Sequence, residues 1–139
     1  MRRPPLLVVL PAHFPIILRG SGSAPLPRIL LVEDDVDVRL IIEHVLIDAG
    51  YEVDTTGTTA GGTELLRCRS YDLVVADGKL PDGTGMEVCD LAAEKGIKCL
   101  IVTGYAFSLP VGSGERYDIL LKPMRPTEII SAVERKLRE

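Results

Sequence analysis

The sequence ILLVEDD at residues 29–35 is the stretch that decides the fold. Four aliphatic residues are followed without a break by three acidic residues. A short and wholly apolar run of this kind is typical of a strand that is buried on both faces, as in a parallel sheet. The abrupt change to acidic residues predicts that the strand ends there and that charge lies at the edge of the sheet.

Outward from this stretch, strands and helices alternate along the chain. Further apolar runs predict strands at residues 51–55, 73–76, 99–102 and 119–121. Apolar residues at helical spacing, with stop signals, predict helices at residues 38–49, 58–69, 84–94 and 126–137. Between them, Pro110 and Gly112 to Gly114 break the pattern, so the fourth helix is expected to be short or irregular. Strict alternation predicts an α/β fold with a doubly wound, five-stranded parallel sheet and helices on both faces.

The first 28 residues have a different composition. They contain six of the ten prolines and four arginines, and they contain no acidic residue. Proline cannot continue a helix or a central strand, so residues 1–28 are expected to form a flexible, basic, Pro-rich extension and residues 29–139 the folded domain. The apolar stretch at residues 6–18 is too short to span a bilayer. A flexible arm, a signal-like segment and a mis-assigned start all remain open for this extension.

The charge of the folded part argues against nucleic acid as a partner. The net charge is −4 over the 139 residues, a length typical of one domain. Residues 29–139 contain 12 basic and 20 acidic side chains, which gives −8. Proteins that bind nucleic acid usually present a basic patch or stripe, so direct binding to DNA or RNA is not expected.

The three cysteines, Cys68, Cys89 and Cys99, are odd in number and contain no C-x-x-C pair. No histidine lies at a metal-ligand spacing from them. They are therefore expected to be small buried residues in a reducing compartment and not part of a disulfide framework or a zinc site.

Polar residues follow four of the predicted strands. They are Glu33 and Asp34 after the first, Asp77 after the third, Thr103 after the fourth and Lys122 after the fifth. Sites in open parallel sheets form outside the carboxyl ends of the strands, so these side chains are expected to share one pocket. Three carboxylates with one lysine leave a local charge of −2, which favours a hard divalent ion such as Mg²⁺. A metal, a lysine and a hydroxyl around one nucleophilic carboxylate suit phosphoryl transfer.

This combination resembles the receiver domain of bacterial two-component response regulators, a CheY-like receiver. The motifs that carry the resemblance are ILLVEDD at 29–35, DLVVADGKLPDGTGMEV at 72–88, IVTGY at 101–105 and LLKP at 120–123. Each is weak alone, but four in this order, each at a strand end, are a strong signal. The resemblance covers residues 29 to about 138 and implies the flavodoxin-like strand order 2-1-3-4-5.

The resemblance also implies a role for each residue of the pocket. Asp77 would be the phospho-acceptor, receiving a phosphoryl group from a histidine kinase or a phosphotransfer protein. The implied Mg²⁺ ligands are Glu33, partly through water, Asp34, Asp77 and the backbone carbonyl of Lys79. Lys122 and the hydroxyl of Thr103 would contact the phosphoryl oxygens, and Pro123 would follow a cis peptide bond.

The function expected from this resemblance is that of a stand-alone receiver in a phosphorelay. The protein would be a cytoplasmic phosphoprotein that signals to a downstream protein target, with no membrane or nucleic-acid contact; formation of a homodimer is left open. The chain ends at Glu139, soon after the last predicted helix, so no output domain is expected. The protein would not be an enzyme in the usual sense, although it would promote its own phosphorylation. Lys79 and Tyr105 are expected to obstruct water, which would make self-dephosphorylation slow.

Two other functions stay open. Receivers commonly carry Tyr or Phe three residues before the lysine, where this chain has Ile119, with Tyr117 two residues further back. The alternative is therefore a receiver-like interaction module that no longer depends on phosphorylation. A phosphohydrolase would carry a second aspartate two residues after the nucleophile, where this chain has Lys79.

Asp35 and Asp37 flank a predicted helix start and are expected to cap that helix and not to bind metal.

Overall fold

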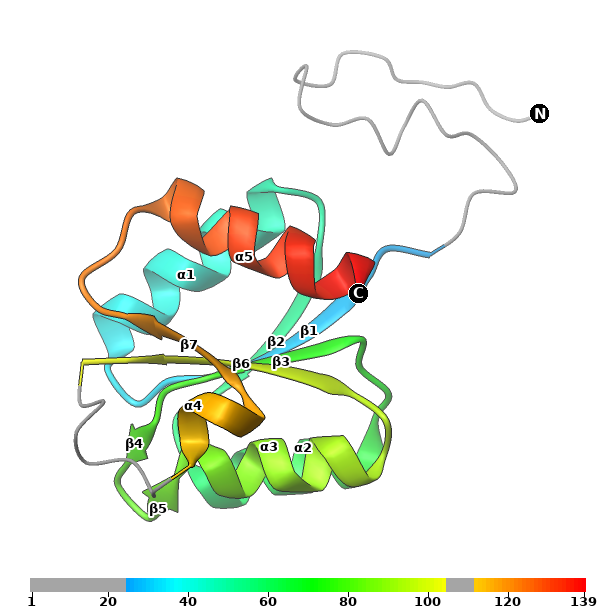
Figure 1. Ribbon diagram of the computed structural model, residues 1–139. Helices are drawn as coiled ribbons and strands as arrows, with labels where there is room; N and C mark the ends of the chain where they lie inside the picture. Colours follow the sequence, from blue (N-terminus) through cyan, green and yellow to red (C-terminus); the bar gives the residue numbers. More distant parts are fainter. Residues whose placement is uncertain (1–24, 105–111) are drawn as a thin grey trace.

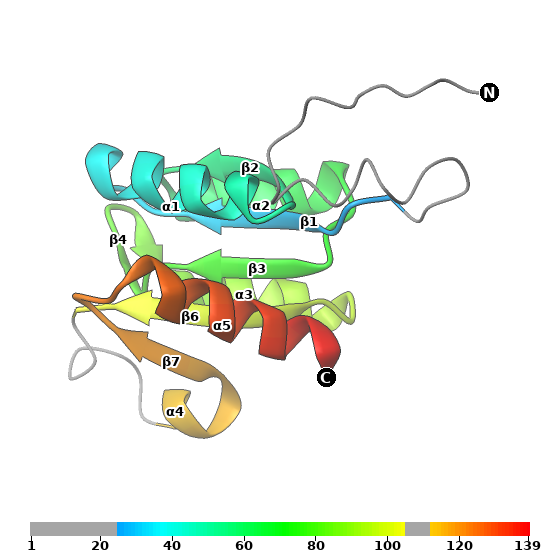
Figure 2. The same ribbon diagram turned by 90° about the horizontal axis from the view of Figure 1, so that it is seen from above.

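The computed structural model describes residues 25–104 and 112–139, which form three layers. A parallel sheet lies between two layers of helices (Figure 1). Its strands are β1 (Arg28–Val32), β2 (Glu52–Thr56), β3 (Leu73–Ala76), β6 (Lys98–Thr103) and β7 (Asp118–Leu121). They pair in the order β2-β1-β3-β6-β7, which Figure 2 shows from above. Counted within this sheet, the order is the expected 2-1-3-4-5, so the predicted doubly wound fold is confirmed.

Two helices cover each face of the sheet. One layer contains α1 (Val36–Asp48) and α5 (Pro126–Arg138), and the other contains α2 (Thr59–Cys68) and α3 (Gly85–Glu94) (Figure 1). The fourth helix, α4, comprises only Ser113–Arg116, so the prediction of a short fourth helix is confirmed. None of the helices in the described ranges has both the length and the apolar character needed to cross a membrane.

Alternate residues of the central strands β1, β3 and β6 supply the two halves of the core. Leu30 and Val32 of β1 pack with α2 and α3, while Ile29 and Leu31 pack with α1 and α5. All four side chains are buried. Because both faces of the central strands are covered, these strands need apolar residues at every position, which explains the unbroken run at the start of the domain.

Side chains at the helix ends satisfy backbone groups that have no partner within the helix. Asp35 precedes α1 and its Oδ1 accepts a hydrogen bond from the backbone N–H of Val38 at 3.1 Å, as expected for a cap. Gly50, after the end of α1, has a φ of +103°, which glycine adopts without strain. As Asp35 does for α1, Thr58 caps the start of α2, because its Oγ1 accepts a hydrogen bond from the N–H of Gly61 at 2.9 Å.

Cys89 and Cys99 are buried as expected, but the expectation for the cysteines was wrong in two other respects. Cys89 of α3 and Cys99 of β6 are joined by a disulfide, with their Cα atoms 5.6 Å apart, while Cys68 is exposed. The spacing along the chain gave no sign of this pair. It forms because α3 packs directly on β6, and this contact turns two buried side chains of different elements toward each other.

Two further features differ from the sequence pattern. The short antiparallel pair β4 (Lys79–Leu80) and β5 (Gly83–Thr84) was not expected, because two-residue strands leave no periodic pattern. Arg28, placed in the extension by composition, is the first residue of β1. Its side chain forms ion pairs with Glu52 and Asp54 of the neighbouring strand β2.

Candidate functional site

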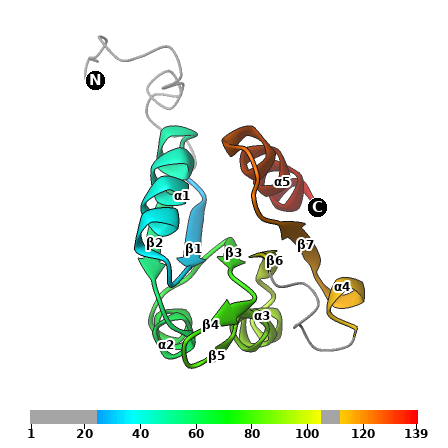
Figure 3. The same cartoon turned by 90° about the vertical axis from the view of Figure 1, so that its left-hand side faces the viewer.

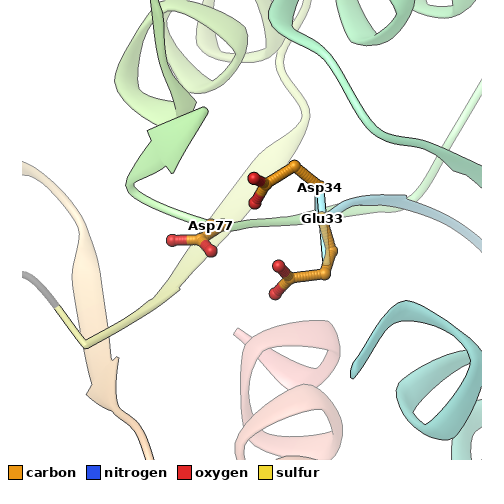
Figure 4. A group of neighbouring side chains, drawn as sticks. All are labelled: Glu33, Asp34 and Asp77. Carbon is orange, nitrogen blue, oxygen red and sulfur yellow. The ribbon is translucent and has the colours of Figure 1, made fainter. Parts of the chain in front are cut away.

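The candidate site lies at the carboxyl ends of the parallel strands, which meet at one edge of the sheet (Figure 3). Glu33 and Asp34 directly follow β1, and Asp77 directly follows β3. These strands are neighbours, and Val32 pairs with Ala76 at their ends. Carboxylate oxygens of the three residues therefore lie within 4.8 Å of one another (Figure 4).

Lys122 brings a positive charge to this acidic group from the end of β7. Its Nζ donates hydrogen bonds to Oε1 of Glu33 at 2.7 Å and to Oδ2 of Asp77 at 3.0 Å. The backbone N–H of Lys122 donates to the carbonyl oxygen of Thr103 at 3.0 Å, which fixes the lysine to the end of β6. The Lys122–Pro123 peptide bond is cis, as the resemblance implies.

Burial sets the electrostatics of the site. Glu33 is 2% exposed and Asp77 is 5% exposed. Burial raises the pKa of Glu33 and outweighs the hydrogen bond from Lys122, which acts in the opposite direction. Burial alone would lower the pKa of Lys122, but its hydrogen bonds to Glu33 and Asp77 outweigh this and raise it. Lys122 is therefore charged at neutral pH, and it is outnumbered by the carboxylates.

The donor set fits a hard divalent cation such as Mg²⁺. All of its side-chain donors are carboxylate oxygens, two from buried residues and one from the exposed Asp34, where coordinating water has access. The backbone N–H of Lys79 donates to Oδ1 of Asp77 at 3.1 Å, so the main chain of residue 79 lies beside this carboxylate. Among the residues described, no other group of three or more His, Cys, Asp or Glu lies close enough to hold an ion.

The loop after Asp77 folds back on the site. The backbone N–H of Gly85 donates to the carbonyl oxygen of Gly78 at 3.2 Å. A Cβ at Gly85 would overlap the carbonyl oxygen of Asp77, so only glycine allows α3 to begin this close to the acidic group. Thr84 directly precedes α3 but makes no side-chain capping bond with it.

The remaining predicted residues lie around this centre. Thr103 ends β6 and is fully buried. Tyr105 lies outside the described residues. Ile119 and Tyr117 pack against the same half of the core, and the hydroxyl of Tyr117 donates to Oδ1 of Asp90 on α3 at 2.7 Å. Tyr117 therefore does not replace the Tyr or Phe that receivers commonly have at the position of Ile119.

Arg39 is a residue that sequence reasoning missed. Its Nη1 donates to the carbonyl oxygen of Glu33 at 2.7 Å, so it holds the backbone that carries the acidic pair. A Cβ at Gly57 would lie 2.8 Å from the same Nη1, so this glycine leaves room for the guanidinium. No pattern in the sequence singles out Arg39, because an arginine on a helix surface is ordinary and only folding brings it to the carbonyl of Glu33.

Comparison with known proteins agrees with this geometry. The model of the response regulator receiver domain family matches residues 29–134. The DNA-binding response regulator MtrA of Mycobacterium tuberculosis is 30% identical over 115 residues, which cover 80% of this chain and 50% of MtrA. The chain therefore spans about half the length of this relative.

Solved structures of receiver domains have the same fold. A CheY-like receiver domain protein from Methanospirillum hungatei has a TM-score of 0.72 and 28% identity over 81% of this chain and 94% of its own. The response regulator TrrA of Thermotoga maritima, solved in complex with Mg²⁺-BeF, has a TM-score of 0.72 and 26% identity over 79% of this chain and 98% of its own. With its sheet order and its acidic pocket, this chain belongs to the family of response regulator receiver domains.

Proposed function

We propose that this receiver is switched by transfer of a phosphoryl group to Asp77, in a reaction that depends on Mg²⁺, and that it signals through protein contacts in a phosphorelay. One observation carries the proposal. A carboxylate oxygen of the buried Asp77 lies within 4.8 Å of oxygens of Glu33 and Asp34, and the carboxylate accepts a hydrogen bond from the charged Lys122. The net acidic charge of residues 29–139 favours a protein target over nucleic acid.

The proposed step is a displacement at phosphorus. A carboxylate oxygen of Asp77 attacks the phosphoryl group of a phosphohistidine, a P–O bond forms, and the P–N bond breaks with its electron pair going to the imidazole. Lys122 would neutralise charge on the transferred oxygens, and its hydrogen bond to Glu33 supports this role. The hydroxyl of Thr103, at the end of the adjacent strand, would bind another phosphoryl oxygen.

The proposed metal site consists of this chain's own oxygen donors. They are the carboxylates of Glu33, Asp34 and Asp77 and the backbone carbonyl of Lys79. Bound Mg²⁺ would neutralise charge on the phosphoryl oxygens during transfer. The complex of TrrA with Mg²⁺-BeF supports this proposal, since TrrA has the same fold.

A surface next to Lys122 suits a protein as phosphodonor. An open groove of about 360 Å³ runs between α1 and the segment that follows β7, with apolar walls formed by Ile41, Val45, Met124 and others. Val36, Leu40 and Ile41 on α1 are each more than half exposed. A histidine kinase or phosphotransfer protein would bury these side chains while it brings its phosphohistidine to Asp77.

Slow self-dephosphorylation is part of the proposal. The side chain of Lys79 is exposed at the site, two residues after Asp77, where it would hinder the approach of water. Action as a stand-alone receiver, a cytoplasmic location and a flexible extension before Arg28 stay predictions, and formation of a homodimer stays open.

The test is labelling of the full chain by a small phosphodonor, phosphoramidate, followed by intact-mass analysis. We expect a phosphoryl adduct that needs Mg²⁺, that is absent in Asp77→Asn, and that is retained in the control Asp118→Asn, whose carboxylate lies on β7 and pairs with Lys136. An adduct that persists in Asp77→Asn would disprove the assignment of Asp77. If the unaltered chain takes no label at all, the receiver-like interaction module becomes the better account.

A further inference from the structure

The hairpin β4–β5 lies beside the beginning of α2 (Figure 3), and one side chain joins them. Asp82 is at the turn between the two short strands. Its Oδ1 accepts a hydrogen bond from the backbone N–H of Thr59 at 2.7 Å, and its Oδ2 accepts one from the N–H of Ala60 at 2.9 Å. Both oxygens of this carboxylate are therefore used to hold the first turn of a helix that starts 23 residues earlier.

The three N–H groups at the start of α2 are all satisfied by side chains, but from two different sources. Thr58, the residue before the helix, accepts from Gly61 and keeps its bond local. Asp82 accepts from the other two, so it connects two separate parts of the chain. The hydrogen bonds from the backbone of Ala60, the larger cause, and of Thr59 also lower the pKa of Asp82. The carboxylate therefore stays ionised at the positive end of the helix dipole.

A second bond ties the other side of the hairpin to the same helix. The hydroxyl of the buried Thr59 donates to the carbonyl oxygen of Thr84 at 3.3 Å. β4 and β5 pair through only two residues each, and a hairpin this short is not stable by itself. The position of the hairpin therefore depends on its contacts with α2 together with the burial of Leu80 of β4 in the core.

The same loop supplies two parts of the candidate metal site. It begins at Asp77 and passes through Lys79, the first residue of β4, whose N–H donates to Oδ1 of Asp77. It ends at Gly85, against the carbonyl oxygen of Asp77. A shift of the turn at Asp82 would move the main chain of Lys79 relative to the three carboxylates.

We propose that Asp82 is a positioning residue for the metal site. By fixing the hairpin to the first turn of α2, it would hold the backbone carbonyl of Lys79 in position to bind Mg²⁺. The inference rests on the proposed function in one respect, which is the assignment of this carbonyl as a ligand. Asp82 itself does not contact the ion.

The experiment measures the dissociation constant of Mg²⁺ by calorimetry on the full chain, without phosphodonor. In Asp82→Ala we expect the dissociation constant to rise about tenfold. This is the lower end of the loss of metal affinity that follows when a residue that orients a ligand is removed. Asp82→Asn keeps one acceptor oxygen and should give a smaller rise. The matched control is Thr58→Ala, which removes the local bond to Gly61 at the same helix end and should destabilise α2 without changing Mg²⁺ affinity.

Three results would overturn the inference. One is a dissociation constant in folded Asp82→Ala or Asp82→Asn that stays within twofold of the unaltered chain. Another is an equal rise in Thr58→Ala, which would mean that fraying of α2 alone weakens the site. The third is absence of Mg²⁺ binding in the unaltered chain. If Mg²⁺ binds and Asp82→Ala weakens it, but phosphoramidate gives no label, then the proposed function fails and the inference stands.

Discussion

Two charged clusters lie toward opposite ends of the same parallel strands and differ in their balance of acid and base. The site cluster, at the carboxyl ends, has the carboxylates of Glu33, Asp34 and Asp77 around Lys122. The Asp54 cluster includes residues at the amino ends of β1 and β3. The carboxylate of Asp54 accepts from three donors there, from Arg28, Arg69 and Tyr71, and Arg28 also pairs with the exposed Glu52.

The pKa values reflect this difference. Oδ2 of Asp54 accepts from the hydroxyl of Tyr71 at 2.6 Å and from Nη1 of Arg69 at 3.1 Å. The hydrogen bond from Tyr71 is the main reason why the pKa of Asp54 is lowered. The hydrogen bond from Arg69 lowers it further. Burial raises the pKa of Glu33 instead. One cluster is complete and supports the fold, while the other carries excess negative charge that a cation can neutralise.

The largest effect on the free energy of unfolding should come from the disulfide. The disulfide belongs to neither cluster, so it serves as a reference for both. Reducing the Cys89–Cys99 bond, which closes a loop of about ten residues, should lower the free energy of unfolding by about 3 kcal/mol. Urea unfolding with and without reductant, in a Cys68→Ser background, measures this. The difference should vanish in the double variant Cys89→Ala/Cys99→Ala; a difference that remains there would show that the reductant acts elsewhere.

Removing one cation from each cluster should sharpen the comparison. Lys122→Met leaves buried carboxylates without their cation and should destabilise the domain by about 2 kcal/mol at neutral pH without Mg²⁺, less than for a fully buried pair because Lys122 is partly exposed. Arg69→Met removes one of three donors from Asp54, and Arg69 is exposed, so it should cost less than about 1 kcal/mol. Equal losses in urea unfolding would mean that the two clusters do not differ as described.

The last effect is a dependence of stability on pH. The pKa of Asp54 is lowered from 3.8, so its contribution is present above pH 3.8 and is lost as the pH falls through the lowered value. Asp54→Asn should therefore cost about 1 kcal/mol at pH 7 and progressively less below pH 4. Unfolding of the two proteins at both pH values checks this. A cost that is the same at pH 7 and at pH 3 would contradict the ionic account of this cluster.

Much of the fold was predictable because its signals are local. The run at residues 29–32 is apolar at each position, and Asp35 and Gly50 mark the limits of the helix that follows. The site centre was predictable for the same reason, since acidic residues come directly after two strands. The pair β4–β5 was not, because a two-residue strand has no periodicity that a sequence can show.

The sequence by itself determined the alternation of strands and helices, and with it the edge of the sheet where Glu33, Asp77 and Lys122 meet. Local preference and burial are enough for this, because parallel strands bring their carboxyl ends to one side. Only the tertiary structure decided the disulfide, the contact of Arg39 with the acidic turn and the tie from Asp82 to α2. These contacts depend on how one element is rotated and packed against another, and no pattern within a single element specifies that.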